Sequence, residues 1–387
     1  MRSRYTVELA RDWHDNVGAV AARALAASPF QKPVWLAQWY ATLGRRRDVQ
    51  PIIAIVRERS SGDPVALFPL VGHAAGNRRI VQFADLGITD YNAPLLFAGA
   101  PTTRAGAVAM LQALTDALER EGDLLRLIKM PAMIGSMTNP LALLPSAETS
   151  PLGSNLVRID GSWESYHRSL DGKVRRELER SWRLFVRDGV DARFVRASDP
   201  GEAKRILAQL SGLQRERITS LGKPYVLDEE GCHDFYERLI EQGLGSGYTV
   251  VTALISGEFD VVAGLLSVSD GRSLAMLRLG QAGGAWARCS PGRLLFDRTM
   301  HAMHAAGLTE FDFTIGDYAY KETFRVERTP LVDVIRPLTL RGRATFGFER
   351  AGMRTREHLR SMPFLYEALK RIAGGIRGNR RGLGSLS

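Results

Sequence analysis

The sequence predicts an α/β protein made of two similar halves, each a mixed, mostly antiparallel sheet flanked by helices. Each half contains two β-rich runs around a turn with Gly and Asp, PIIAIVRE with PVALFPLV and YTVVTALI with VVAGLLSVS. In each half a third β-rich run follows, then a helical run and a last strand. A hairpin combined with one crossover helix indicates a mixed sheet rather than a doubly wound parallel one.

The elements of the two halves correspond in order. In the first half, RRIVQFAD is the third strand, a helix is expected over about 102–121, and DLLRLIKM closes the set. In the second half, SLAMLRLG is the third strand, a helix follows Ser290, and EFDFTI is the last strand. Because few residues are identical between the halves, we interpret this as a structural duplication rather than a sequence repeat.

Helical periodicity fills the region between the halves. Apolar residues recur at helical spacing in 172–188, which is strongly basic, and in 202–220, and a third helix is expected over 229–243. A chain of 387 residues is too long for one small core. We therefore predict an N-terminal half (1–155), a C-terminal domain (156–340) and a basic helical tail (341–387).

Composition is typical of a soluble globular protein, with 45% hydrophobic and 24% charged residues. Two cysteines are too few for a disulfide framework, and no apolar run is long enough for a signal or a membrane span, so a cytoplasmic location is expected. The tail carries eleven Lys and Arg against three Glu, most of the net charge of +10. It is interpreted as a solvated helix; the alternative is peripheral contact with acidic lipid on the inner face of the membrane.

The turn before the second crossover helix is a candidate anion site. Ser290 is a favoured N-cap, Pro291 suits the first helical position, and Gly292 lets a ligand approach the backbone. Free N–H groups at the helix start would then face a phosphate, with Arg288 and Arg293 beside it. The alternative is an ordinary capped helix, since Ser-Pro helix starts are common.

Polar residues follow the last strand of the second half in the loop GDYAYKETF. Asp317 is a candidate base or amine-holding carboxylate, Tyr320 a candidate proton donor, and Lys321 a candidate ligand for an anionic group. Acyl transfer to an amine requires such groups. The alternatives are a turn residue for Asp317 and a helix start for Tyr320 and Lys321.

Three further residues are candidates for substrate binding. Arg217 lies near the end of a helix and faces either an acceptor or water. Asp90 and Tyr91 lie in the loop that corresponds to the Ser290 turn of the other half; the alternative is a loop closed by its own Asp and Asn side chains. No dinucleotide, P-loop, HExxH or CxxC motif is present, so no metal site is expected.

The run CSPGRLLFDRTMHAMHAAGLTEFDFTIGDYAYKETFR resembles the CelD-type acyltransferases of bacterial polysaccharide loci, which belong to the GNAT superfamily of N-acetyltransferases. The matching parts are Ser290-Pro291-Gly292, Asp312, Gly316-Asp317 and Tyr320-Lys321. LSGLQRERITSLGK, KVRRELERSWRLFVRDG and, in the first half, SPFQKPVWLAQWY, LFPLVG and DYNAP are similar to the same family. The loop RCSPGR departs from the superfamily's usual glycine-rich pyrophosphate loop.

The resemblance implies tandem GNAT-like halves similar to Fem-type transferases, with acetyl-CoA or another acyl-CoA as co-substrate and an amine-bearing small molecule or sugar as acceptor. The expected function is an acyl-CoA-dependent N-acyltransferase, with a role in exopolysaccharide or cell-envelope biosynthesis. The alternatives are a Fem-like aminoacyltransferase acting on a cell-wall precursor, which would bind tRNA, and a non-catalytic scaffold of a polysaccharide synthase.

Overall fold

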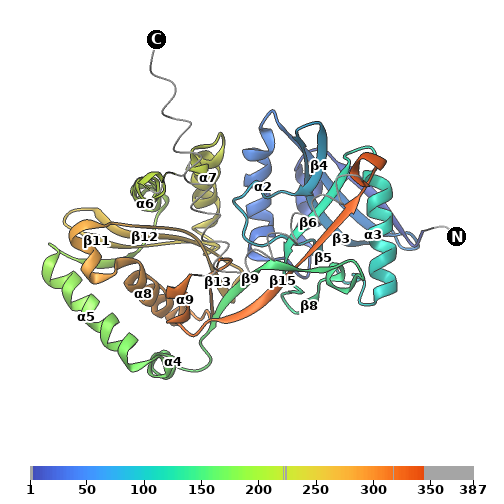
Figure 1. Cartoon of the computed structure of the whole chain (residues 1–387). Coiled ribbons are helices and arrows are strands. Elements are labelled where there is room, and N and C mark those ends of the chain that lie inside the picture. Colours follow the sequence, from blue (N-terminus) through green and yellow to red (C-terminus); the bar gives the residue numbers. More distant parts are fainter. Residues whose placement is uncertain (1–2, 221, 223–224, 317, 344–387) are drawn as a thin grey trace, which may run out of the picture.

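A computed structural model describes residues 3–220, 222, 225–316 and 318–343, and a single sheet runs through both halves of this part of the chain (Figure 1). Thirteen described strands form the sheet. In spatial order they are β1 (Tyr5–Ala10), β2 (Val49–Glu58), β3 (Pro64–Ala75), β4 (Arg78–Phe83), β6 (Leu124–Met130), β15 (Glu327–Pro337), β9 (Glu148–Arg158), β14 (Glu310–Asp312), β13 (Ser273–Gln281), β12 (Asp260–Ser269), β11 (Thr249–Ser256) and β10 (Arg193–Arg196), with β5 (Leu95–Leu96) beside β3.

The predicted duplication is confirmed by the pairing of the strands. In the N-terminal half, β2, β3 and β4 are antiparallel, and β6 returns parallel to β4 after helix α3 (Arg104–Leu118). In the C-terminal half, β11, β12 and β13 are antiparallel, and β14 returns parallel to β13 after helix α8 (Pro291–Ala305). Each crossover helix thus joins two parallel strands, as a strand–helix–strand unit requires.

Two long strands join the halves. β15 pairs antiparallel with β6 on one side and with β9 on the other, and β9 pairs in turn with β14. Figure 1 shows β15 crossing from one half of the molecule to the other. The predicted domain boundary after residue 155 therefore falls inside β9, a strand that both halves share.

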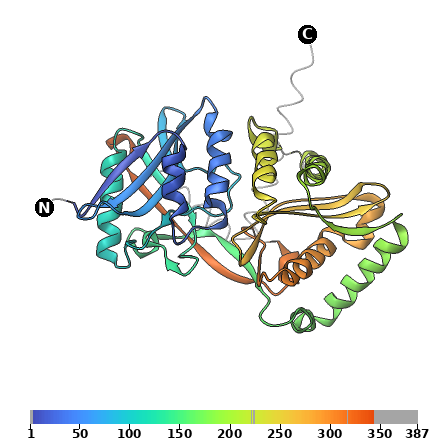
Figure 2. The ribbon, with the colours of Figure 1, turned by 180° about the vertical axis from the view of Figure 1, so that it is seen from behind.

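The helices cover both faces of the sheet (Figures 1 and 2). On the C-terminal half, α6 and α7 lie on one face, and α5 and α8 on the other. The remaining helices and short elements are α1 (Asp15–Ala22), α2 (Pro33–Ala41), α4 (Trp163–Ser169), α5 (Gly172–Asp188), α6 (Pro200–Ser220), α7 (Cys232–Gly243), α9 (Ala319–Glu322), the 3-10 helices η1 (Pro29–Gln31), η2 (Leu43–Arg45), η3 (Pro140–Leu143), η4 (Val226–Asp228) and η5 (Gly284–Cys289), and a separate hairpin of β7 (Met133–Ile134) and β8 (Met137–Thr138).

The sequence signals explain where the predicted helices begin and end. α5 has the predicted bounds because the Asp171 side chain accepts a hydrogen bond from the N–H of Lys173 and Gly189 follows the last residue. Leu178 and Phe185 on this helix are buried, as the helical spacing predicts. None of the described helices is long and apolar enough to cross a membrane. Of the predicted basic tail, residues 344–387 lie outside the described part.

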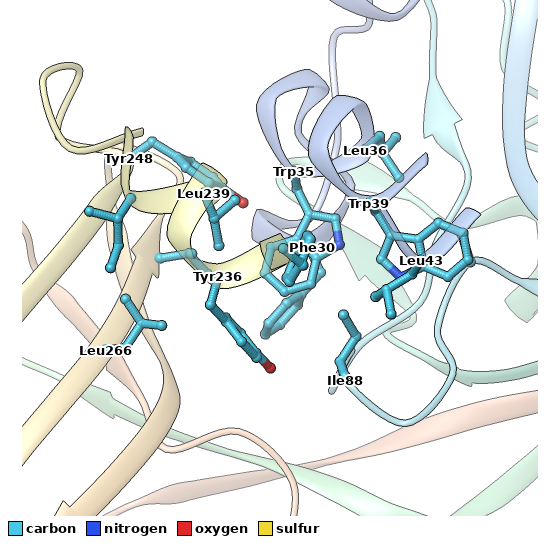
Figure 3. Close-up of a cluster of buried hydrophobic side chains, with 14 of the residues drawn as sticks. Phe30, Trp35, Leu36, Trp39, Leu43, Ile88, Tyr236, Leu239, Tyr248 and Leu266 are labelled. Carbon is cyan, nitrogen blue, oxygen red and sulfur yellow. The ribbon is translucent and has the colours of Figure 1, made fainter. Parts of the chain in front are cut away.

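A shared apolar core holds the halves together (Figure 3). Trp35 on α2 packs edge-to-face against Phe235 on α7, with ring centroids 4.9 Å apart. The hydroxyl of Tyr248 donates a hydrogen bond to the carbonyl of Pro29 at 2.7 Å. Each large apolar side chain buried here contributes about 1.5–3 kcal/mol. The interface therefore fixes the position of one half against the other.

Candidate functional site

A pocket of about 530 Å³ lies where β13 ends and α8 begins. We call it the strand-end pocket. Its walls come from the C-terminal end of α6, the end of β13, the loop to α8, the first turns of α8 and the short helix α9. The lining residues are Leu213, Glu216, Arg217, Ser220, Leu279, Gln281, Ala282, Gly283, Ala287, Ser290, Pro291, Gly292, Arg293, Phe296 and Tyr320.

The pocket is open because β13 and β14 part from each other. They pair only from Ser273 to Ala275, opposite Glu310 to Asp312, although β13 continues to Gln281. The register between β12 and β13 shifts after Leu266, and this leaves one extra residue in β13. Such a bulge bends its strand and increases the local twist. The end of β13 is thereby turned away from β14, and a wedge opens between the two strands.

The Ser290 turn differs from the predicted N-cap. Ser290 does precede the helix, but its backbone is left-handed (φ 46°, ψ 59°) and its side chain makes no capping hydrogen bond. A serine in this region carries a conformational cost, and such residues are concentrated at functional sites. The prediction of a side-chain cap was therefore wrong, because the turn from η5 into α8 requires a sharp reversal rather than an extended N-cap. Pro291 occupies the first helical position, as predicted.

The N–H of Gly292 is already used within the protein. It donates a hydrogen bond to Oε1 of Gln281 at 2.8 Å. A Cβ on Gly292 would lie 2.3 Å from that oxygen, so a larger residue here would displace the Gln281 side chain and break this bond. The expectation that this N–H is free for a ligand is thus wrong for the structure as it stands. Gln281 was missed by sequence reasoning, because nothing distinguishes it from any polar residue at a strand end.

Arginines surround a second, smaller pocket on the other side of the Ser290 turn. This arginine pocket has a volume of about 280 Å³. It shares Ser290 and Arg293 with the strand-end pocket, and its full lining is Glu177, Leu178, Arg180, Ser181, Arg288, Ser290 and Arg293. The predicted residues Arg288, Ser290, Pro291, Gly292 and Arg293 therefore all line one pocket or the other.

The two predicted arginines have different surroundings. Nη1 of Arg293 pairs with Glu177 at 3.2 Å, whereas its Nε and Nη2 are buried and have no hydrogen-bond partner in the described part of the chain. Nη2 of Arg288 pairs with Asp188 at 2.9 Å, and its side chain is largely exposed. Buried donors without a partner are costly. The unpaired guanidinium nitrogens of Arg293 therefore suit an anionic ligand group.

Tyr320 is the predicted catalytic residue that the structure places in the strand-end pocket. Its ring stacks on Phe296, with centroids 5.6 Å apart and planes 11° apart. Burial raises the pKa of Tyr320 to about 12, and nearby Arg217 opposes this only in part. The phenol is therefore protonated at neutral pH and can donate a hydrogen bond. Arg217, predicted to bind substrate, lines the same pocket.

Lys321 has a different position from the predicted one. Its side chain is completely buried, and Nζ donates hydrogen bonds to the carbonyl oxygens of Phe313 and Ile315, each at 2.8 Å. These bonds hold the loop that follows β14, and Lys321 does not line the pocket. Asp317, the other predicted catalytic residue, lies outside the described residues.

Asp90 and Tyr91 lie at the boundary between the halves, and neither of them lines the strand-end pocket. The hydroxyl of Tyr91 donates a hydrogen bond to Oδ1 of Asp312 at 2.9 Å. Burial raises the pKa of Asp312 to about 7, and burial also raises the pKa of Asp90. The loop is in addition closed by its own side chains, since Asn92 donates to Asp85 at 3.0 Å. The sequence analysis assigned no chemical role to Asp312. The signal that could have indicated one was an acidic residue next to the apolar Phe311 in a predicted strand.

No group of three or more His, Cys, Asp or Glu residues in the described ranges is placed to hold a metal ion. The polar groups of the two pockets include the phenol of Tyr320 and the guanidinium groups around Ser290, and the carboxylates of Asp90 and Asp312 lie at the boundary between the halves. The guanidinium groups can bind an anionic ligand, and the phenol and the carboxylates can form hydrogen bonds or transfer protons.

Comparison with known proteins agrees with this arrangement. Residues 172–322 match a family model described as an acetyltransferase (GNAT) domain, and this range contains both pockets. No curated protein matches the sequence.

Solved structures of similar fold include FemX, with 12% identity, a TM-score of 0.55, and coverage of 85% of this chain and 97% of that chain. L-PGS from Bacillus licheniformis has 13% identity, a TM-score of 0.50, and coverage of 84% and 91%. The C-terminal domain (DUF2156) of a putative lysylphosphatidylglycerol synthetase from Agrobacterium fabrum has 12% identity, a TM-score of 0.50, and coverage of 83% and 91%. At these identities the likeness shows the fold. The chain therefore shares the fold of these structures, and its residues 172–322 are similar to the GNAT acetyltransferase domain.

Proposed function

We propose that the protein is an N-acyltransferase that transfers an acyl group from an acyl-CoA to an amine. The observation that carries this proposal is the continuity of the two pockets across the Ser290 turn. One is an apolar wedge that ends at Tyr320, and the other is lined by three arginines. An acyl-CoA has the matching shape, with an apolar arm, a pyrophosphate and a further phosphate in sequence.

The chain's own residues suit each part of such a donor. Leu213, Leu279 and Phe296 would contact the pantetheine arm in the strand-end pocket. The start of α8 would face the pyrophosphate, as helix N-termini do with anions. The unpaired nitrogens of Arg293, with Arg180 and Arg288, would bind the remaining phosphate in the arginine pocket.

In the transfer, the amine nitrogen forms a bond to the thioester carbonyl carbon and the carbon–sulfur bond breaks. The nitrogen loses a proton and the thiolate gains one, so the products are an amide and a free thiol. The pKa of Tyr320, about 12, lies well above the value of about 8.5 for a cysteine thiol. Tyr320 would therefore stabilise the departing thiolate by a hydrogen bond, rather than by giving up its proton completely.

Titration calorimetry with acetyl-CoA and longer acyl-CoAs tests the donor. We expect binding of a CoA thioester, and weaker binding of the dephospho-CoA form that lacks the 3′-phosphate. Arg288→Gln should weaken the binding of CoA more than that of dephospho-CoA. Arg187→Gln is the matched control, because Arg187 pairs with the same Asp188 at 2.7 Å but does not line the arginine pocket. Absence of binding by any CoA thioester, in a folded sample, would rule out the proposal.

A Fem-like aminoacyltransferase is the second candidate, favoured by the many basic residues on α5 beside the arginine pocket. This function requires an aminoacyl-tRNA donor, whose binding would fall steeply with salt. Binding of charged tRNA without binding of acyl-CoA would select it. The resemblance to CelD-type transferases supports a role in polysaccharide or cell-envelope biosynthesis, and acyl transfer to a known acceptor from that class of pathway would test this role.

A further inference from the structure

Two carboxylates from different halves of the chain face each other at the boundary between the halves. Asp90 comes from the loop after β4, and Asp312 is the last residue of β14. Both lie deep in the protein and both retain partial access to solvent. Asp312 also stands where β13 and β14 separate, so it lies at the base of the wedge that opens into the strand-end pocket.

The contacts of Asp312 leave one of its oxygens available. Oδ1 accepts hydrogen bonds from the hydroxyl of Tyr91 at 2.9 Å and from the N–H of Thr314 at 2.7 Å. Among the described residues, Oδ2 accepts none. Because the two donors occupy the same oxygen, they fix the orientation of the carboxylate and leave Oδ2 for a ligand.

Thr314 lies beside both carboxylates. Its N–H donates a hydrogen bond to Oδ1 of Asp312, and its side chain lies close enough to Asp90 to oppose the rise in the pKa of that carboxyl. Its backbone is left-handed (φ 56°), which is a costly conformation for a β-branched residue. The carbonyl of Thr314 accepts a hydrogen bond from Nδ2 of Asn155 at 2.7 Å, and this bond helps to hold the conformation.

The basic groups near these carboxylates are engaged elsewhere. Lys129 forms its salt bridge with Asp85 at 2.7 Å. Lys321 donates to the carbonyl oxygens of the loop after β14, and Arg278 on β13 donates to Gln214 and Tyr225, at 2.9 and 2.6 Å. Within the described ranges neither Asp90 nor Asp312 forms a salt bridge. The pair therefore lacks a counter-ion in contact with it.

A hydroxyl points into the same region. Tyr236 on α7 is only 2% exposed, yet its hydroxyl has no hydrogen-bond partner among the described residues. Figure 3 shows this hydroxyl pointing from α7 into the space between the halves. The Asp90 carboxylate is close enough to act on the pKa of Tyr236, although burial is the largest influence. Because the hydroxyl makes no hydrogen bond with the described residues, it can bond to a polar ligand.

On the basis of the acyltransferase function above, we propose that the primary ammonium group of the acceptor binds between Asp90 and Asp312, within reach of the Tyr236 hydroxyl. The acceptor enters from the boundary between the halves, and the N-terminal half thereby supplies part of the acceptor site. Asp312 takes one proton from the ammonium group, which leaves a neutral amine to attack the thioester carbonyl carbon. The proton passes from Asp312 to solvent through the partly accessible boundary.

The electrostatics of the pair agree with this assignment. Burial raises the pKa of each carboxyl; the charge of Asp90 adds to the rise at Asp312, and the charge of Asp85 adds to the rise at Asp90. The charge of Lys321 opposes the rise in the pKa of both carboxyls, and the charge of Lys129 also opposes it at Asp90. A cation between the two carboxylates would remove the repulsion between them and favour ionisation of both.

The test uses ligand-observed NMR with the full chain and four primary amines: n-pentylamine, glucosamine, lysine and spermidine. Each is compared with its fully N-acetylated derivative, in which no amine nitrogen carries an ammonium charge. We expect at least one amine to bind at about pH 8, with its N-acetyl derivative weaker by about tenfold or more. Asp90→Asn and Asp312→Asn should each weaken the binding of this amine by a similar factor. Lowering the pH to about 5.5 should also weaken the binding of this amine to the wild-type protein, since protonation removes the carboxylate charge.

Asp297→Asn is the matched control. Asp297 is also a buried carboxyl whose pKa is raised by burial, but it lies on α8 on the opposite face of the sheet. This variant should bind the amine as the wild type does. Binding of none of the four amines, binding by the Asp90→Asn or Asp312→Asn variant as tight as by the wild type, or an equal loss in the control would overturn the proposal. Acetyl-CoA affinity is measured separately by calorimetry, so failure of the donor proposal is distinguished from failure of the acceptor site.

Discussion

The side chain of Gln281 accepts a hydrogen bond from the N–H of Gly292 at 2.8 Å, so the last residue of β13 caps the helix that follows it. The Ser290 side chain, which would ordinarily cap this helix, makes no such bond. The Gln281 amide thus occupies the position where the pyrophosphate of an acyl-CoA would contact the helix N-terminus. Donor binding is expected to displace it.

Substitution of Gln281 should separate stability from donor binding. Gln281→Ala removes the cap and should lower the free energy of unfolding by about 1 kcal/mol. Gln281→Glu places a negative charge at the N-terminus of α8, where it stabilises the helix, but this charge repels the donor phosphates. We expect acetyl-CoA to bind the Ala variant at least as well as the wild type, and the Glu variant more weakly. Urea unfolding and calorimetry measure the two effects; equal affinities for the two variants would contradict this account.

Replacement of Gly292 should damage both the fold of the turn and the pocket. Gly292→Ala introduces a Cβ that would lie 2.3 Å from Oε1 of Gln281, so the Gln281 side chain must swing away and its hydrogen bond to the helix start is lost. The expected loss of stability is about 1 kcal/mol, as for the loss of a helix cap. Thermal unfolding and acetyl-CoA binding are the measurements. Gly212→Ala is the control, since its Cβ would meet nothing within 4 Å; wild-type behaviour of Gly292→Ala would be incompatible with the geometry described.

Loss of the Tyr320 hydroxyl should slow the chemical step and leave donor binding intact. In Tyr320→Phe the ring can still stack on Phe296, but the hydrogen bond to the departing thiolate is lost. We expect kcat to fall by about 10²-fold, with little change in acetyl-CoA affinity. Tyr318→Phe is the control, because Tyr318 stacks on Tyr320 at 5.8 Å but is mostly exposed. An equal fall in kcat for the two variants would remove Tyr320 from the reaction.

The raised pKa of Asp312 should appear in the pH dependence of stability. In the folded protein this carboxyl titrates at about 7, above the usual value of 3.8, so the folded state binds more protons between these values. Its contribution to stability is therefore complete below about pH 4 and is lost as the pH rises through about 7. Between about pH 5 and pH 8, the free energy of unfolding of the wild type should fall by on the order of 2 kcal/mol more than that of Asp312→Asn. Urea unfolding at both pH values checks this, and parallel losses in the two proteins would contradict it.

Activity should rise over the same pH range, because only ionised Asp312 can accept the proton of the ammonium group. The pH profile of kcat/KM for an amine that binds should show a rising limb near pH 7 in the wild type. Asp297→Asn should keep this limb, since that carboxyl lies on the opposite face of the sheet. A limb that persists in Asp312→Asn would assign the titration to another group.

Much of the architecture was predictable because the spacing of apolar residues within a short segment indicates which of them are buried. The predominantly apolar strand β11 and most of β12 are buried along their length, and the amphipathic run of α5 forms a helix with the predicted bounds. The joining of the halves by β9 and β15 was not predicted. These strands carry no signal for their distant partners, and β15 pairs with β6 from just over 200 positions earlier in the chain.

The sequence by itself determined the order of strands and helices, the duplication, and the location of the Ser290 turn, because each follows from hydrophobic periodicity and turn residues within a short segment. Only the tertiary structure decided which polar groups meet. Gln281 reaches Gly292 because a bulge turns the end of β13, and Tyr91 reaches Asp312 across 221 positions because β9 and β15 bring the halves together. Such contacts depend on long-range pairing, and a polar residue in a loop looks the same in sequence whether it faces water or a distant carboxylate.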